Sequence, residues 1–258
     1  MPVSTMDVQT DDGTMEVHLH SAGPVPPART VIFFPDAGGV RPTMHDMAQR
    51  LASLGFLVAL PNVLYRAGAF EPFDLSTVFT DPVERQRLGL VNQFAVPAAV
   101  MGDVAALLDA LAERPSVNAE RVGCVGYCRG GLMSFTAAGS HPDRVAAAAS
   151  IHGGGIATDE PTSPHRQAGN IRARLYFGVA DNDPHCTPEN QKLLASALDA
   201  AGVTYQLELY PGAAHGFAVP DNPPYDEAAA EQHWRRITAL FTEALAAPAE
   251  AAPAWPAA

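Results

Sequence analysis

The sequence predicts an α/β protein in which helices cover both faces of a mainly parallel sheet. Short apolar segments alternate with segments whose apolar residues recur at helical spacing, and the links between them are short. A chain of 258 residues suits one large domain and can bury a sizeable core. Ligands of such sheets bind outside the carboxyl ends of the strands, so we expect the reactive side chains to follow strands directly.

The first half of the chain alternates strand and helix. Strands are predicted at 30–35 and 56–61, because both are short apolar runs. Between them, four apolar residues recur at helical spacing: Met44, Met47, Leu51 and Leu54. Gly55 then ends that helix. Residues 66–95 are expected to be irregular, and a long excursion of this kind is usually functional or capping. An alanine-rich helix is expected at 97–111.

The second half repeats this alternation. Strands are predicted at 121–127, 145–151, 174–179 and 205–210. Helices are expected from about 130, at 188–201 and, as an amphipathic closing helix, at 226–245. We expect residues 1–246 to form a single domain and the Ala/Pro-rich tail, residues 247–258, to be disordered.

Composition excludes several classes of partner. The net charge of −12 gives no electrostatic footprint for nucleic acid or for an anionic membrane surface. Three cysteines do not make a disulfide framework, and there is no CxxC pair. His185 and Cys186, with the aspartates before them, match no closed zinc set, so we expect no metal and no cofactor. Without a signal-peptide pattern or a long apolar run, the chain is expected to be cytoplasmic.

The run Gly126-Tyr127-Cys128-Arg129-Gly130 is the strongest functional signal in the chain. It fits G-x-C-x-G between an apolar strand and a helical stretch. A nucleophile on such a sharp turn sits in strained backbone, so small residues must flank it at two positions before and two after. We predict that Cys128 is a catalytic nucleophile. The alternatives are an inert cysteine in a glycine-rich turn and a dinucleotide loop, although the glycines do not give G-x-G-x-x-G.

Two later loops carry side chains that could activate this cysteine. The loop after the strand at 205–210 contains His215, which can take the thiol proton and later deliver one to the leaving group. The loop after the strand at 174–179 contains Asp181 and Asp183, and a loop can present either to the histidine. We favour Asp181 because it comes directly off the strand.

Together these segments resemble the dienelactone hydrolase family of α/β hydrolases. The resemblance covers roughly residues 5–245 and lies in the motifs G-Y-C-x-G-G, G-x-x-D and A-x-H-G-F. It implies an α/β-hydrolase fold with a Cys128–His215–Asp triad. It also implies cleavage of an ester bond, often in a lactone, through an acyl-thioester intermediate. The backbone N–H groups of Ala37 and Arg129 are expected to hold the oxyanion.

Some positions depart from the family's pattern. The family's glutamate that contacts the resting thiol is matched by Asp36, which is one methylene shorter and could activate the thiol or only close a turn. Of the two arginines that clamp a substrate carboxylate in the family, one is matched by the segment Glu84-Arg85-Gln86-Arg87, in which we favour Arg87, and the other by Val219. The clamp is thus incomplete, and Arg41 or Arg129 would have to compensate. Arg87 could equally be a surface salt-bridge partner.

The sequence therefore predicts a thiol hydrolase of small-molecule esters or lactones, acting as a monomer or homodimer. One alternative is a ligand-binding scaffold without turnover, which the complete Cys-His-Asp set argues against. Another is an acyl transferase on the same fold, if the excursion at 66–95 forms a lid that excludes water.

Overall fold

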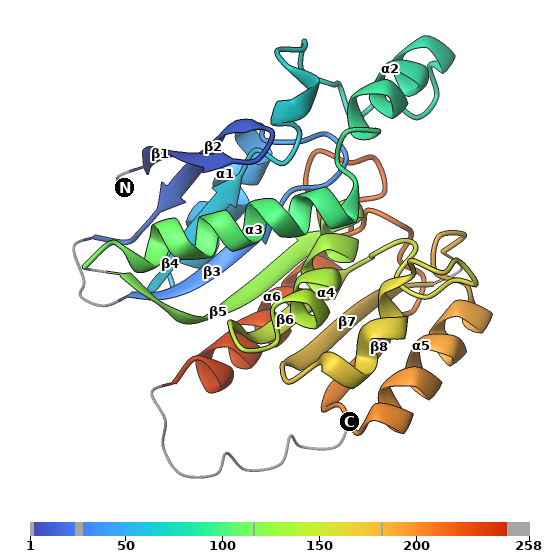
Figure 1. Cartoon of the computed structure of the whole chain (residues 1–258). Helices are drawn as coiled ribbons and strands as arrows, with labels where there is room; N and C mark the ends of the chain where they lie inside the picture. The colour runs from blue at the N-terminus through green and yellow to red at the C-terminus, as the bar shows by residue number, and fades with distance from the viewer. Residues whose placement is uncertain (1–2, 24–27, 116, 182, 247–258) are drawn as a thin grey trace.

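A single sheet organises the molecule. A computed structural model describes residues 3–23, 28–115, 117–181 and 183–246. The strands among these residues are β1 (Val3–Thr10), β2 (Gly13–His20), β3 (Ala28–Phe34), β4 (Phe56–Pro61), β5 (Val117–Tyr127), β6 (Val145–Ile151), β7 (Arg174–Ala180) and β8 (Tyr205–Tyr210). They lie in the order β1-β2-β4-β3-β5-β6-β7-β8 (Figure 1). The strands from β3 to β8 pair in parallel, so the predicted mainly parallel sheet is confirmed.

An antiparallel hairpin at the start of the sheet was not predicted. Strand β1 pairs antiparallel with β2 through a turn ending at Gly13, and β2 pairs antiparallel with β4. Met15, Val17 and Leu19 of β2 are buried, with more exposed residues between them. This alternation is typical of a strand with one face on the core. Only the structure shows that β2 pairs with β1 and with β4.

Helices cover both faces of the sheet, as predicted. The helices are α1 (Pro42–Ala52), α2 (Pro82–Asn92), α3 (Pro97–Ala112), α4 (Arg129–Ser140), α5 (Pro188–Ala201) and α6 (Glu227–Ala244), with short 3-10 turns at Tyr65–Ala67 and Pro164–Asn170. Buried residues of α3, α4 and α5 pack in one core cluster, and those of α1 and α6 pack in another. The two clusters are the two apolar layers that sandwich the sheet.

Helix α2 corrects the expectation that residues 66–95 are irregular. The Asp81 side chain accepts hydrogen bonds from the N–H groups of Val83 and Glu84, and Pro82 stands at the first helical position. Both features stabilise a helix start. The helix lies away from the sheet at the edge of the molecule (Figure 1). The residues that start the helix can be recognised in the sequence. Its apolar periodicity is weak, however, because much of the helix is exposed.

Within the described residues, no single helix combines the length and apolar character needed to cross a membrane. Only α2 and α3 taken together, bent by 56°, reach such a length and composition. The tail at 247–258, predicted to be disordered, lies outside the described residues. The parallel strands β5, β7 and β8 end close to Cys128, Asp181 and the loop of His215, so the sheet collects the predicted reactive residues at one edge.

Candidate active site

Cys128 occupies the sharp turn that the sequence predicts between β5 and α4. Its backbone has φ 52° and ψ −114°, a conformation that non-glycine residues rarely adopt. A Cβ atom at Gly126 would collide with the backbone of Gly130, and one at Gly130 would collide with the carbonyl oxygen of Phe34. The glycines on either side of the cysteine are therefore required by the close approach of neighbouring backbone, as expected.

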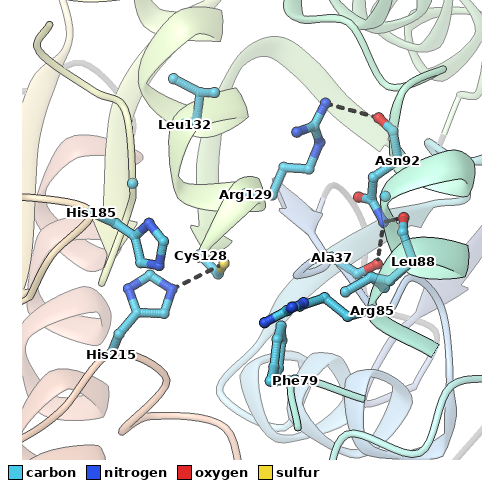
Figure 2. Close-up of a pocket in the computed structure, with 12 residues that line it drawn as sticks. Ala37, Phe79, Arg85, Leu88, Asn92, Cys128, Arg129, Leu132, His185 and His215 are labelled. Carbon is cyan, nitrogen blue, oxygen red and sulfur yellow. Dashed lines mark hydrogen bonds between the residues drawn. The ribbon is translucent and has the colours of Figure 1, made fainter. Parts of the chain in front are cut away.

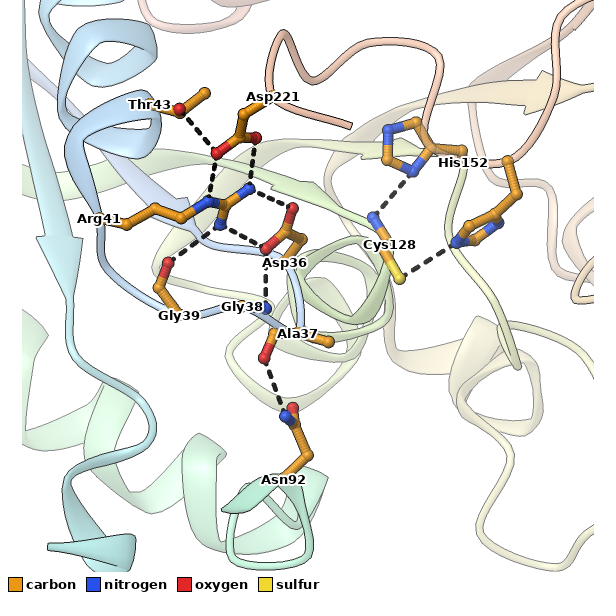
Figure 3. Close-up of polar contacts among 11 residues, drawn as sticks. Asp36, Ala37, Gly38, Gly39, Arg41, Thr43, Asn92, Cys128, His152 and Asp221 are labelled. Atoms are coloured by element: carbon orange, nitrogen blue, oxygen red, sulfur yellow. Dashed lines mark hydrogen bonds and ion pairs between the residues drawn. The ribbon is translucent and has the colours of Figure 1, made fainter. Parts of the chain in front are cut away.

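Backbone and side-chain contacts hold the cysteine turn in place. The Cys128 N–H donates to the carbonyl oxygen of Ile151 at 3.0 Å and to Nδ1 of His152 at 3.1 Å (Figure 3). His152 is buried, and burial first, then the neighbouring His215, lowers its pKa well below the usual range. It therefore acts as a neutral acceptor. Sequence reasoning missed His152, although it follows β6 as the other site residues follow their strands.

His215 joins the cysteine to a carboxylate. Its Nε2 lies 3.1 Å from Sγ of Cys128, and its Nδ1 lies 2.7 Å from Oδ2 of Asp183 (Figure 2 for the first contact). Burial would lower the pKa of His215, but the bonds to Asp183 and to the thiol raise it to about 10. A histidine held in this way can exchange a proton with Cys128 while its charged form stays stabilised.

The carboxylate that contacts His215 belongs to Asp183, so the preference for Asp181 is wrong. Asp183 is buried, and its Oδ1 also accepts the N–H of His185 at 2.8 Å. Asp181 instead accepts the N–H of Gly212 at 3.1 Å. Both aspartates follow β7 within three residues of its end, and only the course of the loop turns Asp183 toward the histidine.

Asp36 does not contact the thiol, contrary to the expected activating role. Its carboxylate accepts two hydrogen bonds from Arg41, at 2.7 and 2.9 Å, and one from the Gly38 N–H at 2.9 Å (Figure 3). Arg41 also donates to both carboxylate oxygens of Asp221, at 2.7 and 2.8 Å. Arg41 is itself buried, so the expectation that it binds substrate is wrong as well: its guanidinium is held between two carboxylates.

The arginine of α2 that lines the cavity at Cys128 is Arg85, not the predicted Arg87. Arg87 forms an ion pair with Glu84, donates to the carbonyl oxygen of Glu71 and lies 4.0 Å from the Phe73 ring centroid. It does not line the cavity at Cys128, so the surface salt-bridge alternative is the correct one. Arg85 does line that cavity, and its guanidinium forms no hydrogen bond or ion pair with any other described residue (Figure 2). Sequence reasoning could have found Arg85 only by predicting helix α2, which carries it.

Val219 and Arg129, the two remaining positions considered for the substrate clamp, make structural contacts instead. Val219 is fully buried in a core cluster and offers no polar group to a ligand. The Arg129 guanidinium donates from Nη2 to the carbonyl oxygens of Asn92 and Ala95, at 3.0 and 2.5 Å. These bonds tie the end of α2 to the start of α4, and the Arg129 side chain still lines the cavity.

The two backbone N–H groups expected to hold an oxyanion are both unengaged. Those of Ala37 and Arg129 donate to no acceptor among the described residues. Ala37 stands in the turn after β3, where the Gly39 N–H bonds back to the Asp36 carbonyl oxygen at 3.1 Å. Arg129 opens α4, whose first N–H groups have no partner within the helix. Both residues line the same cavity as Cys128.

Two cavities, of about 330 and 510 Å³, meet at Cys128 and His215. They share five lining residues: Ala37, Phe79, Cys128, His185 and His215. The His185 ring lies edge-on to the His215 ring at a centroid distance of 4.7 Å, a contact that sequence reasoning did not foresee. Among the described residues, no group of three His, Cys, Asp or Glu side chains is arranged to hold a metal ion. The other cysteines, 124 and 186, are buried, and burial raises the pKa of the Cys186 thiol to about 12.

Comparisons with known proteins agree with this fold and motif set. The chain is 29% identical over 219 residues to a Synechocystis protein named "Putative carboxymethylenebutenolidase", covering 82% of this chain and 84% of the relative. A Salmonella typhi protein of the same name is 29% identical over 220 residues, covering 83% and 76%. A Klebsiella pneumoniae structure described as "Putative Dienelactone Hydrolase" superposes with a TM-score of 0.80 at 22% identity, covering 94% of this chain and 98% of that one, which shows the shared fold.

A family model also matches most of the chain. The model of the dienelactone hydrolase family matches residues 16–245, which include the cysteine turn and the loops after β7 and β8. The chain therefore belongs to the dienelactone hydrolase family and is a hydrolase of the carboxylic ester and lactone type.

Proposed function

We propose that this hydrolase cleaves small carboxylic esters or lactones through Cys128, His215 and Asp183, with an acyl-thioester intermediate. One observation carries the proposal: His215 bridges Sγ of Cys128 at 3.1 Å and Oδ2 of Asp183 at 2.7 Å. Acyl transfer through a side-chain nucleophile recurrently uses a base that contacts the nucleophile and an acid that contacts and orients the base.

In the acylation step, the thiolate sulfur of Cys128 attacks the carbonyl carbon of the ester. The carbonyl oxygen gains negative charge, which the N–H groups of Ala37 and Arg129 stabilise. The carbon–oxygen bond to the alcohol then breaks, and the proton on His215 Nε2 passes to the departing oxygen. Asp183 stabilises the charged imidazole before that transfer, in keeping with the raised pKa of His215.

In the deacylation step, His215 takes a proton from water, and the resulting hydroxide attacks the thioester carbon. The carbon–sulfur bond breaks, the carboxylic acid leaves, and the sulfur departs as a thiolate beside the protonated His215. His152 supports both steps by holding the backbone N–H of Cys128, which keeps the cysteine turn in its strained conformation.

Arg85 is the cation that this proposal assigns to substrate binding, in place of Arg87 and Arg41. It lines the cavity beside Cys128 and has no partner among the described residues. In a chain of net charge −12, an unpaired guanidinium in the reactive cavity favours a substrate with an anionic group.

Mass spectrometry after brief exposure to an activated ester tests the proposal. We expect one acyl adduct per chain, located on Cys128, and its loss together with all turnover in Cys128→Ala. Cys186→Ala is the matched control, because its buried thiol lies outside the cavities and should leave the adduct in place. No adduct and no turnover would instead support a ligand-binding scaffold. An adduct that small alcohols discharge faster than water does would support an acyl transferase.

A further inference from the structure

The two cavities that meet at Cys128 are built by different parts of the chain. The smaller, which we call the α2 arm, has its own lining from α2 and α4: Arg85, Leu88, Gly89, Asn92, Arg129 and Leu132. The larger, which we call the proline arm, is lined by Leu75, Ser76, Thr80, Asn222, Pro223 and Pro224. An ester bound at Cys128 thus has two adjoining spaces for the groups on either side of its carbonyl carbon.

The proposed chemistry decides which side of the ester enters which arm. His215 must stand next to the departing alcohol oxygen to protonate it. The loop that carries His215 continues through Gly216 to Pro223 and Pro224, which line only the proline arm. Arg129, a proposed oxyanion donor, lines only the α2 arm. His215 itself and Ala37, the other proposed oxyanion donor, line both arms. The course of the His215 loop along the proline arm therefore favours the alcohol portion in that arm, and the place of Arg129 favours the acyl portion in the α2 arm.

The proline arm suits an apolar group. Leu75, Phe79 and the two prolines give it a hydrocarbon lining. The hydroxyls on its wall are already engaged locally: Ser76 Oγ donates to Asp74 at 2.6 Å, and Thr80 Oγ1 donates to the Thr77 carbonyl oxygen at 2.9 Å. The exception is Oδ1 of Asn222, which is buried and has no hydrogen-bond partner among the described residues. Because the rest of the wall is hydrocarbon or already engaged, an occupant gains mainly by burying hydrocarbon there.

Asp36, the charged residue on the wall of the proline arm, is likewise engaged. Both of its carboxylate oxygens accept hydrogen bonds from Arg41. The arm therefore offers no free charge that would select a polar alcohol over an apolar one.

We infer that the preferred substrates are open-chain esters with an apolar alcohol of several carbons, seated in the proline arm. The inference rests on the proposed function. A simple lactone is less suited to this arrangement, because its ring ties the alcohol oxygen back to the acyl chain and leaves the proline arm unfilled. In the reaction, the sulfur–carbon bond forms, the carbon–oxygen bond breaks, and the free alcohol takes its proton from His215 and leaves through the proline arm.

Two isomeric esters test the inference. Hexyl acetate and ethyl hexanoate have the same atoms and differ only in whether the longer chain lies on the alcohol or the acyl side. Each methylene buried in an apolar site favours binding by about fourfold. We expect kcat/KM to be at least about tenfold higher for hexyl acetate, since several methylenes enter the proline arm. Equal values, or a preference for ethyl hexanoate, would overturn the inference.

A pair of variants tests the two arms separately. Thr80→Trp fills the proline arm from an exposed position, and Gly89→Leu narrows the α2 arm where an added Cβ meets open space. Thr80→Trp should reduce kcat/KM for hexyl acetate about tenfold more than it reduces kcat/KM for ethyl acetate. Gly89→Leu should reduce kcat/KM for ethyl hexanoate more than it reduces kcat/KM for hexyl acetate. Equal losses for both isomers in Thr80→Trp would contradict the assignment of the arms.

The rate of Cys128 alkylation by iodoacetamide reports separately whether each variant keeps an intact site, because this small reagent needs neither arm. Measurements on the wild-type enzyme distinguish a failure of the proposed function from a failure of this inference alone. If it hydrolyses neither isomer and forms no adduct at Cys128, the proposed function fails and takes the inference with it. If it hydrolyses both without preference, only the inference fails.

Discussion

Asp36 and Arg41 form a buried ion pair, with the guanidinium 2.7 and 2.9 Å from the two carboxylate oxygens, and Asp36 lines the same cavity as Cys128. The same guanidinium binds Asp221, which lies in the loop that follows His215. Arg41 thus ties the turn of Ala37 to the loop of the proposed base. The carboxylate is engaged in this tie, so the contact that holds the thiol comes from His215 alone among the described side chains.

The first prediction separates positioning of the Ala37 turn from activation of the thiol. Asp36→Asn should slow acylation of Cys128 by an ester by about tenfold, because a weakened tie to Arg41 loosens the turn that carries a proposed oxyanion donor. Alkylation of Cys128 by iodoacetamide needs no oxyanion donor and should stay within about twofold of wild type. Stopped-flow acylation and alkylation rates give the comparison, with the exposed Asp46→Asn as control. A parallel loss of both rates would mean that Asp36 acts on the thiol after all.

The second prediction distinguishes the two aspartates after β7. Asp183→Asn should lower kcat/KM by about a thousandfold, because the amide cannot stabilise charged His215 and can hold the wrong tautomer. Asp181→Asn should change it by less than about threefold, since Asp181 contacts only the Gly212 N–H. Steady-state kinetics on one ester with both variants decides the matter, and a larger effect at Asp181 would reverse our assignment.

The third prediction concerns the arginines of α2. Arg85→Ala should raise KM for monohexyl succinate, whose acyl side carries a carboxylate, by about tenfold, as expected for loss of a charge-assisted hydrogen bond. It should leave KM for the neutral hexyl butanoate unchanged. Arg87→Ala removes the ion pair with Glu84 and the contact with Phe73, so it should alter thermal stability more than KM. An unchanged KM for monohexyl succinate in Arg85→Ala, or an equal rise for both esters, would remove Arg85 from substrate binding.

The fourth prediction is a pH dependence of stability. The pKa of His215 is raised from 6.5 to about 10 in the folded chain, mainly by Asp183 and the thiol against the effect of burial. A group whose pKa is raised by folding stabilises the native state fully below its unfolded pKa, and this contribution is lost as pH rises through the folded value. The free energy of unfolding of wild type minus that of His215→Gln should therefore be largest near pH 6.5 and shrink toward pH 10.5. Denaturant titrations at both pH values measure the difference, and a gap that widens with pH would contradict the raised pKa.

Much of the fold could be predicted because its signals are local. The predicted strand at 56–61 and the helix at 188–201 match β4 and α5 exactly in extent. Helix α2 escaped prediction because much of it is exposed, so its apolar periodicity is weak. The hairpin of β1 and β2 was missed although apolar and polar residues alternate along β2. Elements at the periphery owe their position to neighbours that the sequence does not reveal.

By itself, the sequence determined the parallel part of the sheet, the cysteine turn and the pairing of Cys128 with His215, because glycine spacing and the carboxyl ends of parallel strands dictate these features. Only the tertiary structure decided that Asp183 meets His215, that Asp36 is bound by Arg41, and that Arg85 lines the cavity. Each of these depends on the direction of a side chain within a loop or on an exposed helix. Positions one or two residues apart differ little in sequence pattern, yet they face different partners once the chain has folded.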